Sequence, residues 1–321
     1  MRRQFWLISG LAVAIVAATV PLLGFDSYLL YVIELVFIQA TLLLAVNISV
    51  GQAGLVSLAH GSFFGAGAYA SGILMTRYHW DWIVTLIPAV AVAAVAGLGL
   101  GLLTLRLSGP YFVIASMAVA ELGLIVVQNG GTLTNGQLGV SDIPSPAYLE
   151  TETARYLGAL ALLVIGTLFA WLLRRSRTGD RLLALRENEQ LARTVGVDTT
   201  RARLVALVIS AGLAGGAGAF LPVYVGYLSP TNLGEMVGFM ALVALVIGGL
   251  GSLGGSILGA AVLVIIPEFF ADLPYLQPMF LGAALILIIR FAPQGLWGTM
   301  SEGGRRLSGR AKPVSVETEM L

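Results

Sequence analysis

The chain is built from runs of mostly apolar residues, each about 20 residues long, separated by short polar or Gly-rich segments. A helix of this length crosses the hydrocarbon core of a bilayer, whereas surface helices of soluble proteins carry a polar face. Only 11% of the residues are charged, compared with roughly 25% in soluble domains. The pattern therefore predicts an all-α fold, a polytopic bundle of membrane-spanning helices.

We expect about ten transmembrane segments, some of them broken by glycine. The predicted spans are 5–24, 28–47, 58–76, 83–105, 111–128, 157–173, 204–228, 236–250, 255–270 and 275–291. The span that ends at Leu250 is short, and fusing 236–250 with 255–270 would change the count. Residues 1–298 would form a single transmembrane domain, followed by a cytoplasmic tail, 299–321, that we expect to be disordered.

The positions of the basic residues predict the orientation of the chain. Cytoplasmic loops of membrane proteins retain Lys and Arg. With ten crossings, all of the 18 basic residues except Arg77 and Arg155 fall on the side of the N-terminus. Both termini and the basic loop 174–203 are therefore expected in the cytoplasm.

The first predicted span, 5–24, has two interpretations. It is either a retained helix or a signal peptide that follows Arg2 and Arg3. The apolar stretch of a signal peptide is about 7 to 15 residues long, which is shorter than this run and favours a retained helix. The charge pattern does not decide, because cleavage would leave the second span in the same orientation.

The segment 47–69 is not explained by the need to cross lipid. Its polar residues are Asn47, Ser49, Gln52, Ser57, His60 and Ser62, and they lie among glycines. Irregular backbone at membrane depth occurs only where protein or a water-filled cavity satisfies its polar groups. One interpretation is a broken helix that lines a translocation pathway. The other is a cytoplasmic turn before a tightly packed helix, in which Gly61 and Gly65 let a neighbour approach.

A second Gly-rich break, 248–259, lies between two apolar segments nearer the C-terminus. Pairs of interrupted helices mark the substrate path in transporters with internal repeats. No residue-by-residue duplication is visible in this sequence, so an internal repeat is a hypothesis that rests on the two breaks.

Two further features could belong to a pathway. Glu121 lies near the middle of a predicted span, where an ionisable group commonly costs a few kcal/mol; it could orient a substrate ammonium group or pair with a neighbouring helix. The extracytoplasmic loop 129–152 is rich in turn residues and could close the outer mouth, dock a delivery protein or be a solvated connector. The candidate pathway residues are Asn47, Gln52, Ser57, His60, Glu121 and Asn135.

The cytoplasmic loop 174–203 is expected to contain a short helix. Good helix formers run from 180 to 195, Gly196 offers a stop, and Asp198, Thr199 or Thr200 could cap the next span. Leu182, Leu185 and Ala192 recur at helical spacing, with Arg181, Arg186, Glu187, Glu189 and Arg193 exposed around them. The helix would present charges to a cytoplasmic partner, or the loop would only anchor the topology.

No segment is typical of a nucleotide-binding or hydrolytic site. A P-loop needs a Lys that reaches the nucleotide phosphates, and the only Lys of this chain is Lys312, near its C-terminus. The sequence contains no Cys, no HExxH motif and no long polar segment able to form a catalytic domain. We therefore expect no enzyme activity, no metal site, no cofactor and no ATP hydrolysis by this chain.

Several of these stretches, taken in order and spacing, resemble one family of transport proteins. The matching segments are 51–64, 110–112 with Glu121, 134–139, 178–189 with Ala192 and Gly196, 210–215, 248–259 and 292–298. Each is weak alone, but their order and spacing together are specific. The chain resembles the permease subunit of ABC importers for branched-chain amino acids, of the Liv type, with the M-like member the closer fit.

The resemblance implies that the loop 179–196 holds a coupling helix that docks into a cleft of an ATPase subunit. The coupling residues would be Gly179, Arg181, Ala184, Arg186, Glu187, Glu189, Ala192 and Gly196. The resemblance also implies a second homologous permease chain, two ABC ATPase subunits that bind the ATP, an extracytoplasmic substrate-binding protein, and a place in the lipid of the bacterial inner membrane.

Two alternatives stay open at the level of the sequence. Related permeases for urea or short amides share these motifs, and no side-chain pocket for an aliphatic substrate is visible. An autonomous ion-coupled transporter, with Glu121 as the proton or ion site, would need no ATPase. None of these interpretations involves a nucleic acid.

Overall fold

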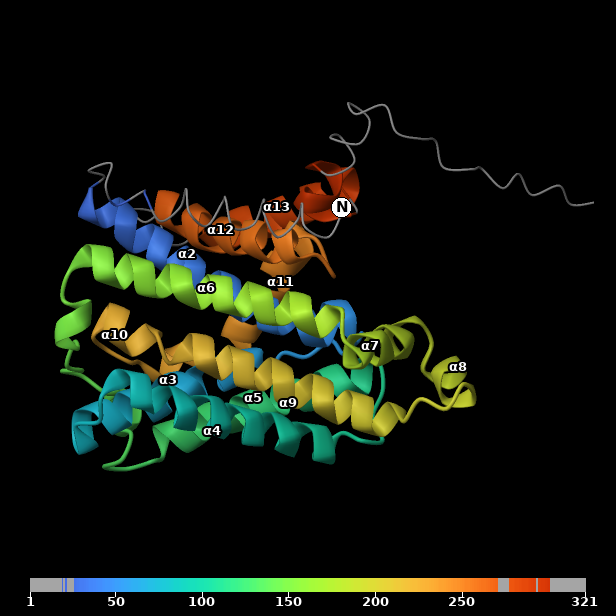
Figure 1. The fold of residues 1–321 in the computed structure, drawn as a ribbon, viewed down its shortest axis with the longest axis horizontal. Helices are drawn as coiled ribbons and strands as arrows, with labels where there is room; N and C mark the ends of the chain where they lie inside the picture. The colour runs from blue at the N-terminus through green and yellow to red at the C-terminus, as the bar shows by residue number, and fades with distance from the viewer. Residues whose placement is uncertain (1–18, 20, 22–25, 271–276, 293, 301–321) are drawn as a thin grey trace, which may run out of the picture.

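The computed structural model of the chain describes residues 19, 21, 26–270, 277–292 and 294–300. In this part every named element is a helix, and the one strand-like pairing is an isolated bridge between Val140 and Leu228. The long helices lie side by side in one bundle (Figure 1), which confirms the predicted all-α fold. The predicted span 5–24 lies almost wholly outside the described residues, as does most of the tail 299–321.

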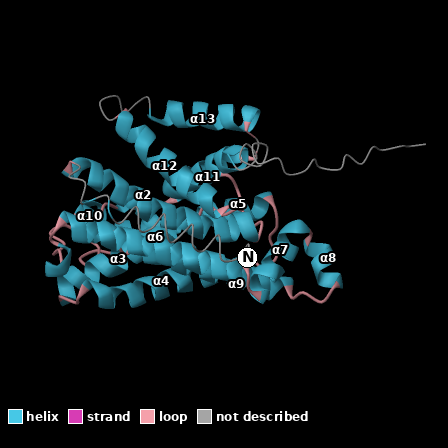
Figure 2. Cartoon of the chain, turned by 45° about the horizontal axis from the view of Figure 1, so that its top comes forward, coloured by secondary structure: helices cyan, strands magenta, loops and turns pink. Residues whose placement is uncertain are grey.

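The described helices follow one another with short connections. They are α2 (Ser27–Val46), its continuation η2 (Asn47–Gln52), α3 (His60–Tyr78), α4 (Trp82–Leu103), α5 (Pro110–Gln128), η3 (Gly136–Leu138), η4 (Ala147–Leu149), α6 (Glu152–Arg174), α7 (Arg177–Glu187), α8 (Glu189–Thr194), α9 (Thr199–Gly218), α10 (Leu221–Val225), η5 (Pro230–Asn232), α11 (Glu235–Gly248), α12 (Leu253–Phe269) and α13 (Gln277–Phe291). α11, α12 and α13 lie together at one edge of the bundle (Figure 2).

Five helical stretches of the described chain are long and apolar enough to cross a membrane. They are Ser27–Gln52, Trp82–Leu103, Pro110–Gln128, Glu152–Arg174 and Thr199–Val225. Two shorter apolar helices, α11 and α12, occupy the predicted spans 236–250 and 255–270, and α3 and α13 occupy 58–76 and 275–291. The helices therefore follow the predicted order, while a total of ten crossings stays a prediction.

The second half of α2 forms the centre of the bundle. Every residue from 40 to 53 is buried, because α2 packs against α6, α9 and α12 and runs on into η2. Thr41, Asn47, Ser49 and Gln52 are the polar side chains in this stretch. Buried polar groups need hydrogen-bond partners. Thr41, Asn47 and Ser49 find them inside the protein, whereas Gln52 Oε1 has none in the described structure.

Glycines let the helices around α2 approach closely. Gly67 of α3 faces the backbone of Gly215 in α9, and Gly61 faces the carbonyl of Gly234, just before α11. A Cβ at Gly61, Gly65 or Gly67 would overlap these neighbours. Small residues at such spacing permit close helix contacts in membranes, and the predicted packing role of Gly61 and Gly65 is confirmed.

The second Gly-rich segment separates two helices. Gly249 and Gly251 have φ angles of 122° and 75°, which glycine adopts without the steric cost that other residues meet. Gly248 packs directly against the backbone of Gly255, so α12 folds back along the end of α11. The alternative of one fused span across 236–270 is therefore excluded.

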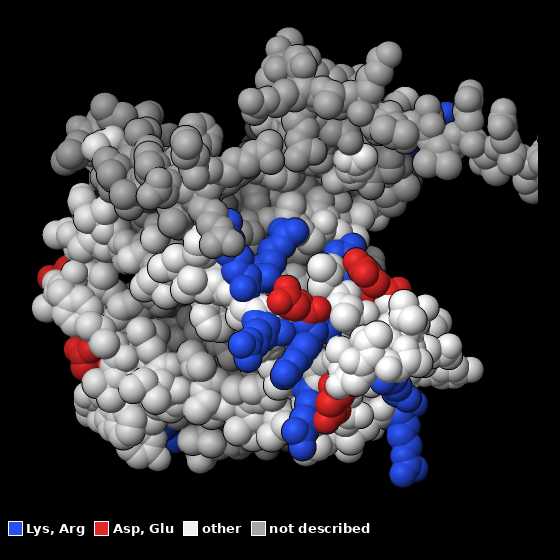
Figure 3. Space-filling model, turned by 45° about the vertical axis from the view of Figure 1, so that its right-hand side comes forward, with Lys and Arg blue, Asp and Glu red and all other residues white. Residues whose placement is uncertain are grey.

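Charged side chains gather at the end of the bundle that carries α7 and α8, which we call the α7–α8 end (Figure 3). The helices α7 and α8 contribute many of these charged side chains. Arg203 of α9 donates to the Leu107 carbonyl in the connection between α4 and α5, which lies at the same end. Arg77 ends α3 and Arg155 begins α6, at the opposite end. The separation agrees with the charge pattern read from the sequence.

Gly97→Val should destabilise the fold, whereas Gly99→Val on the same helix should not. A Cβ on Gly97 would lie 2.5 Å from the Ala211 Cβ and 2.8 Å from the Leu207 carbonyl oxygen, but nothing lies within 4 Å of one on Gly99. Overpacking of this kind costs about 1–3 kcal/mol. Thermal unfolding in one detergent should show a lowered midpoint for Gly97→Val alone; equal midpoints would contradict the close packing of α4 on α9.

Candidate functional site

Helix α2 widens into the π-helix η2 before it ends. The Ala53 N–H donates to the Ile48 carbonyl at 3.2 Å, and the Leu55 N–H reaches back to the Ser49 carbonyl at 2.8 Å. Residues 53–59 then form no regular helix until α3 begins. π-Helical turns are rare and frequent at functional sites. The predicted break in the segment 47–69 is confirmed, and it lies between Gln52 and His60.

Asn47 ties this first break to the second one. Its Oδ1 accepts the Gly251 N–H at 2.8 Å, and its Nδ2 donates to the Ser252 carbonyl at 3.1 Å. The side-chain amide thus supplies partners for backbone groups that leave the helical pattern between α11 and α12. Gly51 makes room, because a Cβ there would overlap Asn47 Oδ1. The two Gly-rich segments, 204 residues apart in the chain, form one site.

Ser49, Ser57 and His60 satisfy one another in the buried core. His60 Nε2 lies 3.2 Å from Ser49 Oγ, and Nδ1 lies 3.4 Å from the Ser57 carbonyl oxygen. Ser57 Oγ also accepts the Ala59 N–H at 3.2 Å. Asn47, Ser57 and His60, predicted for a pathway, are therefore bonded within the protein, where they stabilise the shape of the broken segment; their role in transport stays a prediction.

The other three predicted pathway residues have no such partners. Gln52 Oε1 is buried without a hydrogen-bond partner in the described structure. Glu121 is partly exposed on α5, and Asn135 is exposed in the outer loop with a φ angle of 55°. No hydrogen bond or ion pair joins Glu121 or the Asn135 side chain to another described residue. The structure therefore does not bring these two residues to the Asn47 site.

One face of α5 is apolar and exposed. Its exposed residues are Tyr111, Ile114, Met117, Leu122, Ile125 and Val126. Ser62 Oγ of α3 donates to the Ala120 carbonyl at 2.7 Å and anchors the opposite face. Glu121 follows Ala120 in the chain and lies at the edge of the exposed face. A carboxylate in contact with lipid at this position would be costly.

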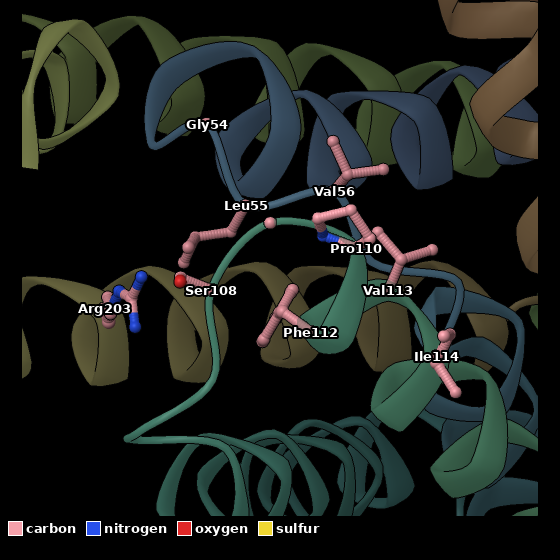
Figure 4. A pocket seen from close by; sticks show the side chains of 10 residues that line it. Gly54, Leu55, Val56, Ser108, Pro110, Phe112, Val113, Ile114 and Arg203 are labelled. Atoms are coloured by element: carbon pink, nitrogen blue, oxygen red, sulfur yellow. The ribbon is translucent and has the colours of Figure 1, made fainter.

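A cavity of about 490 Å³ lies between the irregular segment 53–59 and the start of α5 (Figure 4). Its apolar lining side chains are Leu55, Val56, Pro110, Phe112, Val113 and Ile114. Arg203 of α9 borders it, with Nη1 bonded to the Leu107 carbonyl at 2.9 Å and Nη2 to Glu189 at 2.8 Å. The cavity therefore has a mostly apolar lining and one cationic side chain, Arg203, which is paired with Glu189.

The loop 174–203 folds into two short helices, which corrects the expectation of one helix over 180–195. Asn188 has extended backbone angles, φ −162° and ψ 110°, and its side chain caps α8 by accepting the Leu191 N–H at 3.0 Å. An Asn that bonds its own backbone in this way competes with a continuous helix. Gly196 ends α8 with a φ angle of 85°, and Asp198 caps α9, as the sequence predicts.

The inner face of this loop packs as predicted. Leu182, Leu185 and Ala192 are buried, while Arg181, Arg186 and Glu187 are exposed. Glu189 is only partly exposed. It pairs with Arg193 at 2.7 Å and with Arg203 at 2.8 Å, and so holds α8 to α9.

Of the other predicted coupling residues, Ala184 is half-buried. Gly179 is buried, and a Cβ there would overlap the Leu173 carbonyl at the end of α6.

Three apolar residues on the outside of the loop were missed in the sequence. Leu183 of α7, Leu191 of α8 and Val195 are 48%, 63% and 71% exposed. We call them, with Glu187, the outer face of the loop. Each lies out of phase with the buried positions of the loop, which is the signal in the sequence that could have identified them. Exposed apolar side chains that form a patch are a feature of surfaces that bind a protein or a membrane.

Arg186 turns back toward the bundle. Its Nη1 donates to the Gly51 carbonyl in η2, and the backbone of Arg186 lies against Gly54. Arg174, at the end of α6, donates to the Gly251 carbonyl at 2.9 Å. The sequence predicts that Arg186 is exposed on the loop helix, but only the fold shows which backbone group its guanidinium binds.

The loop 129–150, between α5 and α6, is bound to the bundle at several points. Val140 and Leu228 exchange backbone hydrogen bonds of 3.0 and 2.9 Å, and the Tyr148 hydroxyl donates to Asp81 at 2.8 Å. Burial and this hydrogen bond raise the pKa of Tyr148 to about 12, so the hydroxyl stays a donor at neutral pH. The loop 129–150 is therefore attached to the bundle at Val140 and Tyr148, while most of its residues are exposed.

Within the described residues, no three His, Cys, Asp or Glu side chains are grouped so that they could hold a metal ion. The site consists instead of two broken helices, a loop packed on them, and apolar faces. This arrangement defines a multi-pass membrane protein whose polar centre is built from backbone groups.

Comparison with known proteins identifies the family. The family model described as "Branched-chain amino acid transport system / permease component" matches residues 28–289. The chain therefore belongs to this family of ABC transporter permeases.

Two similar relatives are high-affinity branched-chain amino acid transport system permease proteins LivM. The protein of Escherichia coli is 32% identical over 289 residues, 82% of this chain and 68% of the relative. The protein of Salmonella typhimurium is 30% identical over 296 residues, 84% of this chain and 70% of the relative.

The LivH permease of Escherichia coli is 27% identical over 272 residues, 77% of this chain and 87% of the relative. No solved structure matches the chain. Similarity to both LivM and LivH implies that a second permease subunit belongs to the same kind of system.

Asn47→Leu should destabilise the protein more than Asn129→Leu. The first change leaves the partly buried Gly251 N–H without its partner in the protein, while the Ser252 carbonyl loses one donor and keeps its bonds from Ser256. A fully buried unsatisfied donor costs about 1–3 kcal/mol. Asn129 is exposed and donates only to the carbonyl of Ile125 at the end of its own helix. Thermal unfolding in nanodiscs should separate the two variants; equal midpoints would contradict the role of Asn47 as a bridge between the breaks.

Proposed function

We propose that this chain is the transmembrane permease subunit of an ABC importer that moves branched-chain amino acids across the bacterial inner membrane. ATP hydrolysis would take place on partner subunits. The complete importer would contain a second homologous permease, two ABC ATPases and an extracytoplasmic substrate-binding protein. Membership of the permease family and similarity to LivM over most of the chain support this proposal.

The observation that carries the proposal is the loop made by α7 and α8. Its buried face is fixed to the bundle by Leu182, Leu185 and the ion pair between Glu189 and Arg203. Its outer face exposes Leu183, Leu191, Val195 and Glu187. A rigid, partly apolar projection at the most charged end of a membrane bundle fits docking into a soluble partner such as an ATPase.

The distribution of charge supports the proposed orientation. The α7–α8 end carries most of the described arginines, and cytoplasmic loops are enriched in Lys and Arg. We therefore place this end and both termini in the cytoplasm, with ten spans in total. The outer loop, 129–150, would then face the binding protein.

Transport in this proposal follows from differential binding. A partner shifts an equilibrium between inward-open and outward-open states only by as much as it binds them differently. The ATPases would bind the outer face of the loop, and their closure on ATP would favour one orientation of α7. The permease pair would then expose its pathway to one side of the membrane at a time.

We assign the pathway to the side of the chain formed by α5 and the segment 53–59. Glu121 borders the exposed face of α5, and the cavity lined by Val56 and Ile114 opens near its cytoplasmic end. A second permease chain facing α5 would remove Glu121 from lipid. Gln52 Oε1 is a buried acceptor that has no hydrogen-bond partner among the described residues. Asn47, Ser57 and His60 would keep the broken segment in shape, and Asn135 would lie near the outer mouth.

The cavity also favours the proposed substrate class. Its wall is largely aliphatic, which suits the side chain of leucine, isoleucine or valine better than urea or a short amide. Selection at first encounter would belong to the binding protein. Uptake assays that compare leucine with urea, each with its own binding protein, distinguish the two substrates.

The test is mass spectrometry of gently solubilised native membranes, followed by reconstitution. We expect two ATPases and a second permease to copurify with the chain. Liposomes with this complex and a binding protein should take up labelled leucine only when ATP is supplied. A homo-oligomer without ATPases, or uptake by this chain alone under an ion gradient, would overturn the proposal in favour of an ion-coupled transporter.

Leu191→Glu should release the ATPases, whereas Gln190→Glu should not. The first change puts a carboxylate in place of an exposed apolar side chain on the outer face, and the second puts the same carboxylate at its exposed polar neighbour. Removing an apolar side chain from the centre of an interface costs about 1 kcal/mol or more, so we expect at least fivefold less copurified ATPase. Equal amounts of ATPase in both variants would contradict docking on this face.

Ile114→Trp should block transport while leaving the complex intact. Ile114 is 64% exposed and lines the cavity, so a larger side chain fills the cavity without disturbing the core. Val95→Trp, at a site on α4 that is 68% exposed and outside the cavity, is the matched control. Uptake into liposomes should fall roughly tenfold for Ile114→Trp alone. Normal uptake by that variant would exclude the cavity from the pathway.

A further inference from the structure

Arg186 has a position that docking to an ATPase does not require. It lies on α7, next to Glu187 of the outer face, yet its guanidinium points the other way and donates to the Gly51 carbonyl. Gly51 belongs to η2, whose six residues are all buried. The contact therefore joins the loop to the centre of the membrane domain.

The Gly51 carbonyl is a group that needs such a donor. The last carbonyls of a helix have no partner in the helix itself, and the backbone bonds that close η2 go to the carbonyls of Ile48, Ser49 and Val50. A cation at the C-terminal end of a helix is also favoured by the helix dipole. Arg186 supplies both the hydrogen bond and the charge.

The same guanidinium adjoins the second break. A Cβ on Gly251 would lie 3.0 Å from Arg186 Nη1 and 3.3 Å from the Gly51 carbonyl oxygen. Arg174 donates to the Gly251 carbonyl at 2.9 Å. Asn47 completes the connection with its two hydrogen bonds to the segment between α11 and α12. We call this set the arginine junction: Asn47, Gly51, Arg174, Arg186, Gly251 and Ser252.

We propose that Arg186 is a positioning residue that transmits the movement of α7 to both broken helices at once, through the Gly51 carbonyl and the Asn47 bridge behind it. This inference rests on the proposed function, because it assumes that α7 is moved by a partner. Its physical basis is continuity: Arg186 bonds to Gly51, Gly51 and Asn47 belong to the same helix η2, and the Asn47 side chain bonds to Gly251. Coupling between distant sites travels through such contiguous contacts.

The backbone geometry makes the junction stiff. Gly54, with a φ angle of 71°, lets the Arg186 backbone approach so closely that a Cβ there would lie 3.2 Å from the Arg186 Cα. Leu182 and Leu185 bury the inner face of α7 on the bundle. Because the backbone of α7 packs directly on the bundle at Gly54, the Arg186 side chain would move together with α7.

The test uses three variants in the complete importer. Arg186→Met keeps an unbranched side chain but removes every donor, and Arg186→Lys restores one cationic donor. Arg181→Met removes a charge from the same helix at an exposed position that makes no hydrogen bond or ion pair within the described structure. The outer face of the loop is unchanged in all three, so the ATPases should stay bound.

The functional measurement is leucine transported per ATP hydrolysed in liposomes. We expect this ratio to fall roughly tenfold in Arg186→Met, a typical size for coupling between sites, with ATP hydrolysis retained. Arg186→Lys should recover part of it, and Arg181→Met should match the wild type. Wild-type transport with an unchanged ratio in Arg186→Met overturns the inference and leaves the proposed function standing.

A second measurement does not depend on transport. The chain contains no Cys, so spin labels at Val56→Cys and Leu183→Cys, both partly exposed, report the distance between the segment 53–59 and α7 without background. Arg186→Met should broaden the distance distribution in nanodiscs, and Arg181→Met should not. An unchanged distribution overturns the tether. A wild-type importer that fails to transport, with the broadening still observed, contradicts the proposed function alone.

Discussion

The structure depends on how the polar backbone is satisfied where helices break inside an apolar bundle. A helix in lipid bonds its own backbone, but each break leaves carbonyl and N–H groups without a partner in the helix. In this protein the Asn47 side chain at the first break bonds to Gly251 and Ser252 at the second, and Arg186 of α7 bonds to Gly51. These bonds supply partners for backbone groups at both breaks.

Close contact of the helices is the condition for this arrangement. Gly51 and Gly251 lie where a side chain would push the two breaks apart, and Gly61 and Gly67 let α3 reach α11 and α9. Lipid tails are as apolar as the surface of a membrane helix, so the hydrophobic effect does not drive helices together inside a membrane. Packing and hydrogen bonds decide which helices associate. The high glycine content is therefore a structural requirement of the bundle as well as a source of irregular backbone.

The loop of α7 and α8 has two sides with different roles. Its inner side fixes it to the bundle through buried leucines and through Glu189 with Arg203, and Arg186 extends that contact to the central helix. Its outer side leaves Leu183 and Leu191 exposed. A projection that is fixed to the bundle on one side and exposes apolar side chains on the other suits the proposed transmission of a partner's movement into the bundle.

The sequence by itself determined the helical class, the order of the helices and the two breaks, because apolar run length, Gly and charge position act locally. It also determined which face of the loop is buried and that Gly196 and Asp198 bound it. The partnership of Asn47 with Gly251 and of Arg186 with Gly51 was decided by tertiary structure alone. Their positions in the chain are far apart, and no local pattern encodes which distant backbone group a side chain will reach. The break at Asn188 likewise depends on a local hydrogen bond that competes with a helix of good formers.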